Sequence, residues 1–353
     1  MFTIAGDCAT FCSAGALQPA ALDLLELGGV SGSANAVRYT GREDFEATLH
    51  GMIAAGRTLA FQHLYPADEV SAESYWIPPS LLAELNDKAN LDRFVPTGHL
   101  PPRRVMSTEE AMRLTVGPGQ TIVIKGSTER STGAGGAVVM ARRDEQLRDL
   151  PNRLDGCTRV VVEEFQPFER TMCLNWAVDR SGNLHYIGSA EQVVDDEGAF
   201  LGSWIGTGLD APDAAIAIGR EIMTRAAARG YYGIAGFDMG VLPDGRVLAF
   251  DLNFRLCAST PALLWLPVLL ERCPGRLAAR MATMTFPSGF DRMCSVAAEA
   301  VRAGWLFPLS AFDPSRAGWN GTPPSVRALV LGRDRAETEA RCESLAGSGF
   351  VIR

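Results

Sequence analysis

Lysine is nearly absent from this chain. Only two of its 33 basic residues are lysines, Lys88 and Lys125, and all the others are arginines. A bias in the encoding DNA explains the general preference for arginine, but it does not explain which two positions keep an ammonium group. Arginine offers a planar fork of donors, whereas lysine offers a compact point charge. The two lysines are therefore candidates for a specific function.

Several familiar motifs are absent as well. The eight cysteines form no Cys-x-x-Cys pair and no Cys/His cluster with zinc-ligand spacing, which favours reduced thiols in a cytoplasmic protein. The N-terminus lacks the basic start of a signal peptide. The most apolar run, residues 262–270, is too short to span a bilayer. The glycines near Gly28 do not form Gly-x-Gly-x-x-Gly, so no dinucleotide fingerprint is present.

Length and charge set further bounds. The chain of 353 residues has room for two to three domains. Apolar residues make up 47% and charged residues 21%, which is a globular balance. The net charge of -8 argues against nucleic acid and anionic membranes as partners.

Hydrophobic periodicity predicts alternating helices and strands. Thr58–Gln62 is expected to form a strand after a helix that begins near Glu43. In the segment 189–204, the acidic side chains could hold an ammonium group or could belong to a solvated loop. A Pro-Asp-Gly turn between two apolar runs is typical of a hairpin. The other expected elements are strands at 121–125, 137–140, 159–165 and 325–331, helices at 214–229 and 336–345, and a hairpin at 236–242 and 247–253.

The loop of residues 126–136 is rich in glycine, serine and threonine. Glycines let backbone N–H groups approach phosphate oxygens, and Ser131 and Thr132 add hydroxyl donors. No Gly-Lys-Ser/Thr follows, so the loop is not a P-loop, and such loops alone are most often hairpin connections. Lys125 stands immediately before this loop, which favours a triphosphate site over a plain connection.

A second group of polar residues lies on the expected hairpin. The antiparallel pairing brings Asp238 near Asp251, and the two-residue period puts Asp251, Asn253 and Arg255 on one face. Like charges in apolar surroundings are costly unless a cation or a proton lies between them. Three oxygen ligands on adjacent strands suit a hard cation. The alternative is that these residues cap strand ends or lie on the surface.

A third group is weaker by itself. Glu163, Glu164 and Phe165 end a valine-rich strand, where backbone groups could meet a purine edge and a carboxylate could meet ribose hydroxyls. Carboxylates at strand ends are common and usually solvated.

Taken in order, these segments resemble the ATP-grasp superfamily of carboxylate–amine ligases over about residues 80–260. The most specific match is Gly233–Arg255, which is similar to the family's metal-binding hairpin, with its acidic-x-Asn-x-Arg ending. The resemblance implies an α/β (α+β) fold with ATP held between two antiparallel sheets. It further implies an N-terminal α/β domain (1–85), an ATP-grasp domain (86–290) with a lid at about 115–170, and a small C-terminal α/β unit (291–353).

The resemblance also implies roles for individual residues. It makes Asp238, Asp251 and Asn253 the Mg²⁺ ligands, although glutamate is more usual than aspartate at position 251. Arg255 and Lys125 are the expected catalytic residues, Arg255 as a contact of the phosphate or acyl phosphate. The resemblance also implies a set of ATP-binding residues. The two nucleotide lysines are Lys88 and Lys125, and the phosphate loop supplies Ser131, Thr132, Gly133, Gly135 and Gly136. The adenine hinge is Glu163, Glu164 and Phe165, and the ribose carboxylate is Glu169.

The implied reaction is ATP-dependent formation of an amide (peptide) bond through an acyl phosphate, with release of ADP and phosphate. The outline resembles stand-alone peptide ligases more than biotin-dependent carboxylases, so we expect small amino acids or a short peptide as substrates, as in natural product biosynthesis. Two alternatives are a ligase acting on a carrier-protein thiol and an ATP-binding protein without turnover. Dimers are common among such ligases, which makes a homodimer an expectation.

The two lysines give a direct test. Lys88→Arg and Lys125→Arg should each raise the KM for ATP by about tenfold or more, because loss of a hydrogen bond to a charged group costs about 1.5–3 kcal/mol. Steady-state kinetics against ATP would measure the change, with Lys→Arg variants compared with substitutions of surface arginines. An unchanged KM in both lysine variants would contradict the assignment.

Overall fold

The computed structural model describes residues 2–32, 35–127, 138–154, 156–195, 198–275 and 277–352. The chain forms two compact units. The terminal unit comprises residues 1–57, 201–210 and 258–353, and the middle unit comprises residues 58–200 and 211–257. The domain boundaries expected near residues 85 and 290 stay a prediction, because a compact unit need not coincide with a domain.

The terminal unit is built from segments at both ends of the chain. Its main strands run in the order β9-β12-β14-β13, with β15 paired to β12, and β1 pairs with β2 in parallel. The bounds of these strands are β1 Thr10–Ser13, β2 Ala36–Tyr39, β9 Phe200–Gly206, β12 Ala278–Thr285, β13 Leu306–Phe312, β14 Ser325–Gly332 and β15 Val351–Ile352. Its helices are η1 Phe2–Ile4, α1 Pro19–Leu27, α2 Gly41–Ala54, α9 Thr260–Arg272, α10 Phe290–Arg302, η4 Pro314–Ala317 and α11 Arg335–Gly347.

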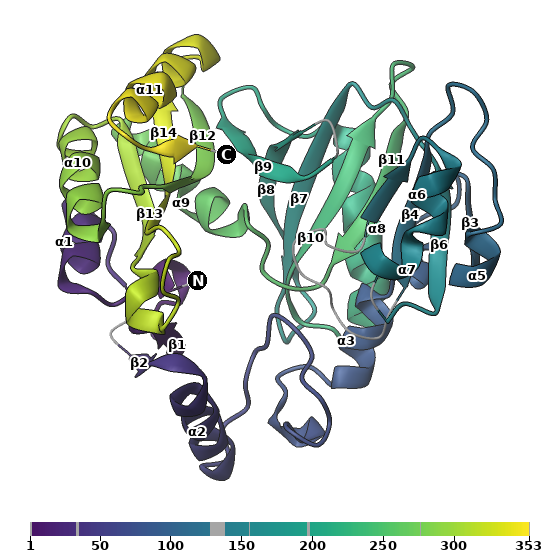
Figure 1. The fold of residues 1–353 in the computed structure, drawn as a ribbon, viewed down its shortest axis with the longest axis horizontal. Helices are drawn as coiled ribbons and strands as arrows, with labels where there is room; N and C mark the ends of the chain where they lie inside the picture. The colour runs from purple at the N-terminus through teal and green to yellow at the C-terminus, as the bar shows by residue number, and fades with distance from the viewer. Residues whose placement is uncertain are drawn as a thin grey trace. The chain divides into compact units, whose positions relative to one another are not determined.

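Apolar side chains explain the packing of this unit. Leu24 of α1 and Met293 of α10 lie in one buried cluster with Ala282, Ala328 and Val330 of the sheet. Figure 1 shows α1 and α10 beside β13 and β14. The two ends of the chain are therefore held in one hydrophobic core.

The middle unit contains two antiparallel sheets. The larger has the strand order β11-β10-β7-β8, and the smaller has the order β3-β6-β4-β5. The bounds are β3 Arg103–Ser107, β4 Ile122–Ser127, β5 Val138–Ala141, β6 Arg159–Glu164, β7 Arg170–Val178, β8 Leu184–Val194, β10 Gly233–Val241 and β11 Val247–Asn253. The helices are η2 Ala72–Ser74, α3 Pro79–Asn86, η3 Lys88–Asn90, α4 Leu91–Phe94, α5 Thr108–Ala111, α6 Asp144–Arg148, α7 Leu150–Arg153 and α8 Asp213–Ala228.

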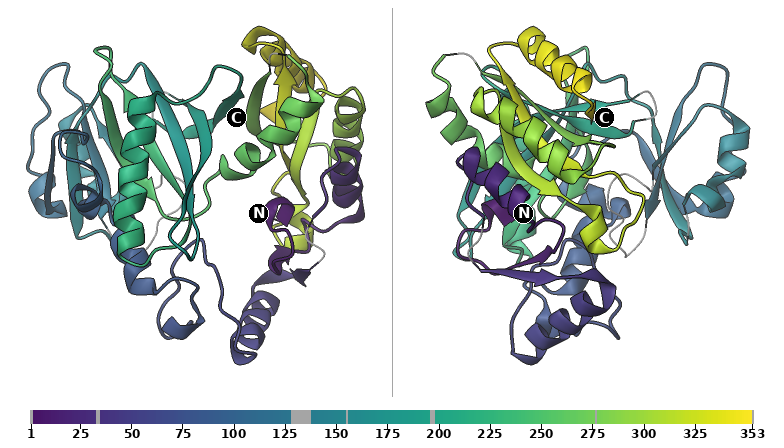
Figure 2. Two further views of the ribbon diagram at one scale, coloured as in Figure 1. Left: turned by 180° about the vertical axis from the view of Figure 1, so that it is seen from behind. Right: turned by 60° about the vertical axis from the view of Figure 1, so that its left-hand side comes forward.

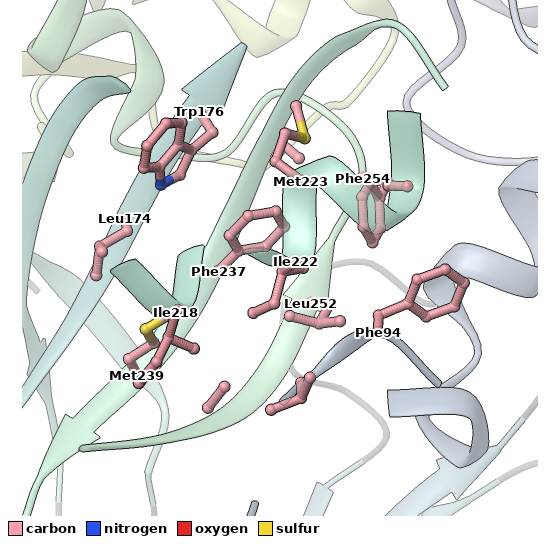
Figure 3. Close-up of a cluster of buried hydrophobic side chains, with 14 of the residues drawn as sticks. Phe94, Leu174, Trp176, Ile218, Ile222, Met223, Phe237, Met239, Leu252 and Phe254 are labelled. Carbon is pink, nitrogen blue, oxygen red and sulfur yellow. The ribbon is translucent and has the colours of Figure 1, made fainter. Parts of the chain in front are cut away.

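One face of the larger sheet is covered by α8 (Figure 2). The alternation of side chains along a strand sends Phe237 and Leu252 into the core with Trp176 and Ile222 (Figure 3). Each of these side chains is at most 2% exposed. Their neighbours in sequence, including Asp238, are consequently directed to the opposite face of the sheet.

The structure confirms most of the expected elements and corrects one of them. The mixed α/β class, the helix ending before Gly230 and the Pro-Asp-Gly hairpin are present. The strand expected at Thr58–Gln62 is wrong, because only Leu59 makes an isolated bridge, to Tyr75. Phe61 instead packs its ring on Tyr75, with centroids 4.6 Å apart. The segment 189–204 is not a single loop, since it contains the end of β8 and most of β9.

None of the helices in the described ranges has the length and apolarity needed to cross a membrane. That finding agrees with the sequence, whose apolar runs are short.

Two helical glycines provide a test of the packing. A Cβ at Gly219 in α8 would lie 2.6 Å from Nε1 of the rigid, buried Trp176, whereas a Cβ at Gly51 in α2 would meet no atom within 4 Å. Gly219→Ala should lower the free energy of unfolding by about 1–3 kcal/mol through overpacking. Gly51→Ala should raise it by about 0.4–1 kcal/mol. Denaturant unfolding measures both, and equal stabilities of the two variants would contradict the packing described.

Candidate active site

The hairpin of β10 and β11 sets two carboxylates against each other. Asp238 is the direct cross-strand partner of Asp251, and Gly236 is the partner of Asn253. Residues directly opposite in an antiparallel pair share a face, so Asp238, Asp251 and Asn253 lie on the face away from Phe237. The structure confirms the juxtaposition of these three side chains that the sequence predicts.

Polar contacts fix the orientation of the carboxylates. Lys88 Nζ donates to Asp251 Oδ1 at 2.5 Å. Asp238 accepts from Gln192 Nε2 at 3.0 Å through Oδ1 and from Asn253 Nδ2 at 3.3 Å through Oδ2. Arg255 Nη1 in turn donates to Asn253 Oδ1 at 2.5 Å. Asp238, Asn253 and Arg255 are therefore joined in one chain of hydrogen bonds, while Asp251 is held separately by Lys88.

The two carboxyl groups respond differently to their surroundings. Burial, together with the nearby charge of Asp251, raises the pKa of Asp238 to about 7. Burial also opposes ionisation of Asp251, but the ammonium groups of Lys88 and Lys125 lower its pKa overall. Near neutral pH Asp251 is therefore ionised, and Asp238 is partly protonated. A cation bound between the two carboxylates would remove their repulsion and could replace the proton on Asp238.

The donor set fits Mg²⁺ in its chemistry. Two carboxylates and an amide oxygen are hard ligands, and Mg²⁺ usually takes one or two carboxylates together with substrate phosphates. No group of three or more His, Cys, Asp or Glu side chains with a metal-binding arrangement occurs among the residues that the structure describes. A metal held here would consequently depend on oxygen ligands from a bound nucleotide as well.

Lys125 reaches the hairpin from the smaller sheet. Its Nζ donates to the carbonyl oxygen of Phe250 at 2.5 Å and lies 5.5 Å from the centroid of the Phe250 ring. The same Nζ lies 2.6 Å from Glu163 Oε2, and the side chains of Lys125 and Glu163 are 6% and 3% exposed. The two lysines of the chain therefore contact consecutive residues of β11, Phe250 and Asp251.

The expected adenine hinge divides into two parts. The Glu163 side chain is turned inward to Lys125, and its residue pairs with Arg103 of β3 and Val123 of β4. Glu164 and Phe165 are exposed at the end of β6. Their roles at a purine edge stay predictions.

The remaining expected residues are Glu169 and those of the glycine-rich loop. Glu169 is exposed, and its backbone N–H donates to the Val241 carbonyl oxygen at 2.9 Å. Its role at the ribose stays a prediction. The residues expected to cover the phosphates lie outside the described residues: Ser131, Thr132, Gly133, Gly135 and Gly136.

Three further polar residues contact Asp238, Lys88 or strand β4, and the sequence did not indicate any of them as a site residue. Gln192 contacts Asp238 from β8. Arg103 Nη2 donates to the carbonyl oxygen of Lys88, and its Nε lies 3.8 Å from Glu163 Oε1. Asp87, only 6% exposed, accepts from Ser127 Oγ at 2.6 Å. Asp87 stands directly before Lys88, which is the one local signal that could have indicated it.

Two family models match this chain. A model described as the N-terminal domain of L-aspartate–L-methionine ligase matches residues 1–83. A model described as the ATP-grasp domain of the same ligase matches residues 101–253. The second range contains the hairpin and Lys125, while Lys88 lies between the two ranges.

Solved structures of low identity have a similar fold. A carboxyaminoimidazole synthetase from Staphylococcus aureus in complex with ADP is 11% identical, with a TM-score of 0.62 and 98% of each chain covered. An L-amino acid ligase from Bacillus licheniformis is 13% identical, with a TM-score of 0.57 and 98% of each chain covered. A biotin carboxylase from Campylobacter jejuni is 12% identical, with a TM-score of 0.58, 98% of this chain covered and 86% of the other. The ATP-grasp fold expected from the sequence is confirmed.

The raised pKa of Asp238 predicts how the stabilisation of the protein by Mg²⁺ should depend on pH. A proton on Asp238 competes with the cation, so Mg²⁺ should raise the melting temperature more at pH 8 than at pH 6, on either side of a pKa of about 7. Asp251→Ala should remove most of the response. Differential scanning fluorimetry with and without MgCl₂ and ADP measures it.

The matched control is Asp244→Asn, because Asp244 is an exposed carboxylate in the turn of the same hairpin. This variant should behave as the wild type. A magnesium response that Asp251→Ala leaves intact would show that the cation binds elsewhere.

Proposed function

Because the chain belongs to the ATP-grasp superfamily of carboxylate–amine ligases, we propose that it uses ATP to join L-aspartate and L-methionine by an amide bond. The observation that carries this proposal is that two lysines contact consecutive residues of β11, Phe250 and Asp251, beside the half-buried carboxylate pair of Asp238 and Asp251. The substrate pair is the one named by both matching family models, which describe separate regions of the chain.

The first step activates a carboxylate. A carboxylate oxygen of one amino acid forms a bond to the γ-phosphorus of ATP while the bond between that phosphorus and the ADP oxygen breaks, which gives an acyl phosphate and ADP. Negative charge is concentrated on the phosphates throughout. Lys88 and Lys125 supply positive charge beside β11, and Arg255 extends it beyond Asn253. Preorganised cations of this kind stabilise the transition state electrostatically.

The second step forms the amide. The amine nitrogen of the other amino acid forms a bond to the acyl carbon, the bond from that carbon to the phosphate oxygen breaks, and the nitrogen gives up a proton to the solvent. The products are the dipeptide and inorganic phosphate. With a pKa of about 7, Asp238 could exchange a proton near neutral pH. We assign it to metal binding instead, because it faces the charged Asp251 and accepts a hydrogen bond from Gln192.

Asp238, Asp251 and Asn253 would hold Mg²⁺, which supplies charge neutralisation on the phosphates when bound. Lys88 contributes to the compensation of the same carboxylate, since its ammonium group lies 2.5 Å from Asp251 Oδ1. Its long side chain lets the ammonium move to a phosphate oxygen once a metal neutralises Asp251. The pair thus keeps a buried carboxylate compensated both before and after nucleotide binds.

The products identify the reaction. With ATP, MgCl₂, L-aspartate and L-methionine, the protein should release ADP and phosphate in step with one dipeptide, detected by mass spectrometry. Each amino acid alone should give little ADP release. Screening pooled amino acids in the same assay tests the substrate pair without presupposing it.

Two results would contradict this function. AMP and pyrophosphate as products would exclude the acyl phosphate route and favour transfer through an acyl adenylate. ATP binding without turnover in any amino acid pool would favour a non-catalytic ATP-binding protein. Asp251→Ala and Asn253→Ala serve as negative controls, and each should lose turnover while keeping the fold.

A further inference from the structure

The short helix η3 is held by both sheets of the middle unit. On one side Lys88 Nζ contacts Asp251 of β11. On the other side Asp87 accepts from Ser127 Oγ of β4 at 2.6 Å and from Arg159 Nη2 of β6 at 2.7 Å. The position of Lys88 therefore depends on strands of the smaller sheet as well as on the hairpin.

Arg103 of the smaller sheet contacts both Lys88 and the carboxylate that binds Lys125. It lies on β3, and its Nη2 donates to the carbonyl oxygen of Lys88. Its Nε lies 3.8 Å from Glu163 Oε1, while Glu163 Oε2 holds Lys125 Nζ at 2.6 Å. One guanidinium thus contacts the backbone of the first lysine and the carboxylate that binds the second.

The environment of Arg103 is costly for a residue with a purely structural role. Its side chain is only 10% exposed, and its Nη1 is buried without a hydrogen-bond partner among the described residues. Burial lowers its pKa, and Glu163 is the largest of the charges that oppose this effect. An apolar side chain of similar volume would often serve stability equally well. A buried guanidinium at this place is better explained by what it holds in position.

We propose that Arg103 is a positioning residue that holds Lys88 and Lys125 together as one rigid pair of cations for the nucleotide. This inference rests on the proposed nucleotide site. The contact to the Lys88 carbonyl fixes the turn from which that lysine extends. The positive charge of Arg103 also lies beside Glu163, so two cations, Arg103 and Lys125, compensate this buried carboxylate.

The consequence of losing Arg103 follows from that balance. Glu163 would then bind Lys125 more strongly and hold its ammonium away from a phosphate. Lys88 would lose the donor that fixes its backbone. Both effects weaken nucleotide binding, and neither requires Arg103 to touch the nucleotide.

The test measures binding of Mg·ADP by isothermal titration calorimetry in wild type, Arg103→Gln and Arg103→Lys. Arg103→Gln should weaken binding by about tenfold or more, as expected for loss of a hydrogen-bonded charge. Arg103→Lys should lie between, because an ammonium keeps the charge beside Glu163 but lacks the planar fork that also donates to the Lys88 carbonyl oxygen. The KM for ATP should rise by a larger factor than kcat falls.

A second substitution separates positioning from a structural defect. Adding Glu163→Gln to Arg103→Gln removes the uncompensated carboxylate and should restore part of the lost affinity. The matched control is Arg104→Gln, because Arg104 is the exposed neighbour on the same strand, and it should bind Mg·ADP as the wild type does.

Two outcomes would overturn the inference, and they are distinguishable. If wild type binds Mg·ADP and both Arg103 variants bind it within twofold of wild type, Arg103 does not position the lysines and the proposed function stands. If wild type itself binds no nucleotide, the proposed function fails and this inference fails with it.

Discussion

The active-site face of the middle unit depends on one constraint, which is the placement of two aspartates opposite each other in a buried antiparallel hairpin. Asp238 and Asp251 are direct cross-strand partners. Two like charges in such an environment repel, so one of them must take up a proton or both must be compensated by cations. The raised pKa of Asp238 and the contact of Lys88 with Asp251 are two responses to this repulsion.

This constraint explains why cations reach the larger sheet from elsewhere. Lys88 comes from the η3 turn and Lys125 from β4, and both contact β11. Each lysine is in turn held by Arg103, either directly or through Glu163. A nucleotide that entered with its metal would take over the compensation that the lysines now provide, and the cations needed for phosphate transfer would already be in place.

The hairpin and its carboxylate pair could be predicted from the sequence because both are local. The Pro-Asp-Gly turn fixes the antiparallel pairing next to it. A bulge between Asp238 and Met239 then shifts the register so that Asp238 meets Asp251, and the sequence pattern does not show this shift. Arg103 could not be predicted, since its partner Glu163 lies on a strand 60 residues further along the chain and since arginine is the ordinary basic residue of this chain. Gln192 was missed for a related reason, because only the acidic residues of the segment that carries it were considered, and its place at the end of β8 was not predicted. Lys125 was found because lysine is rare here, not because its contact with Phe250 could be foreseen.

The measurement that tests the central claim most directly is transfer of oxygen from the substrate carboxylate to phosphate. The acid substrate is labelled with ¹⁸O in its carboxyl group, and the inorganic phosphate released during ligation is analysed by mass spectrometry. If the carboxylate attacks the γ-phosphate at this site, each phosphate carries one ¹⁸O atom from the acid. Unlabelled phosphate, or ¹⁸O found in AMP, would contradict the acyl phosphate mechanism and the role assigned to the paired carboxylates and lysines.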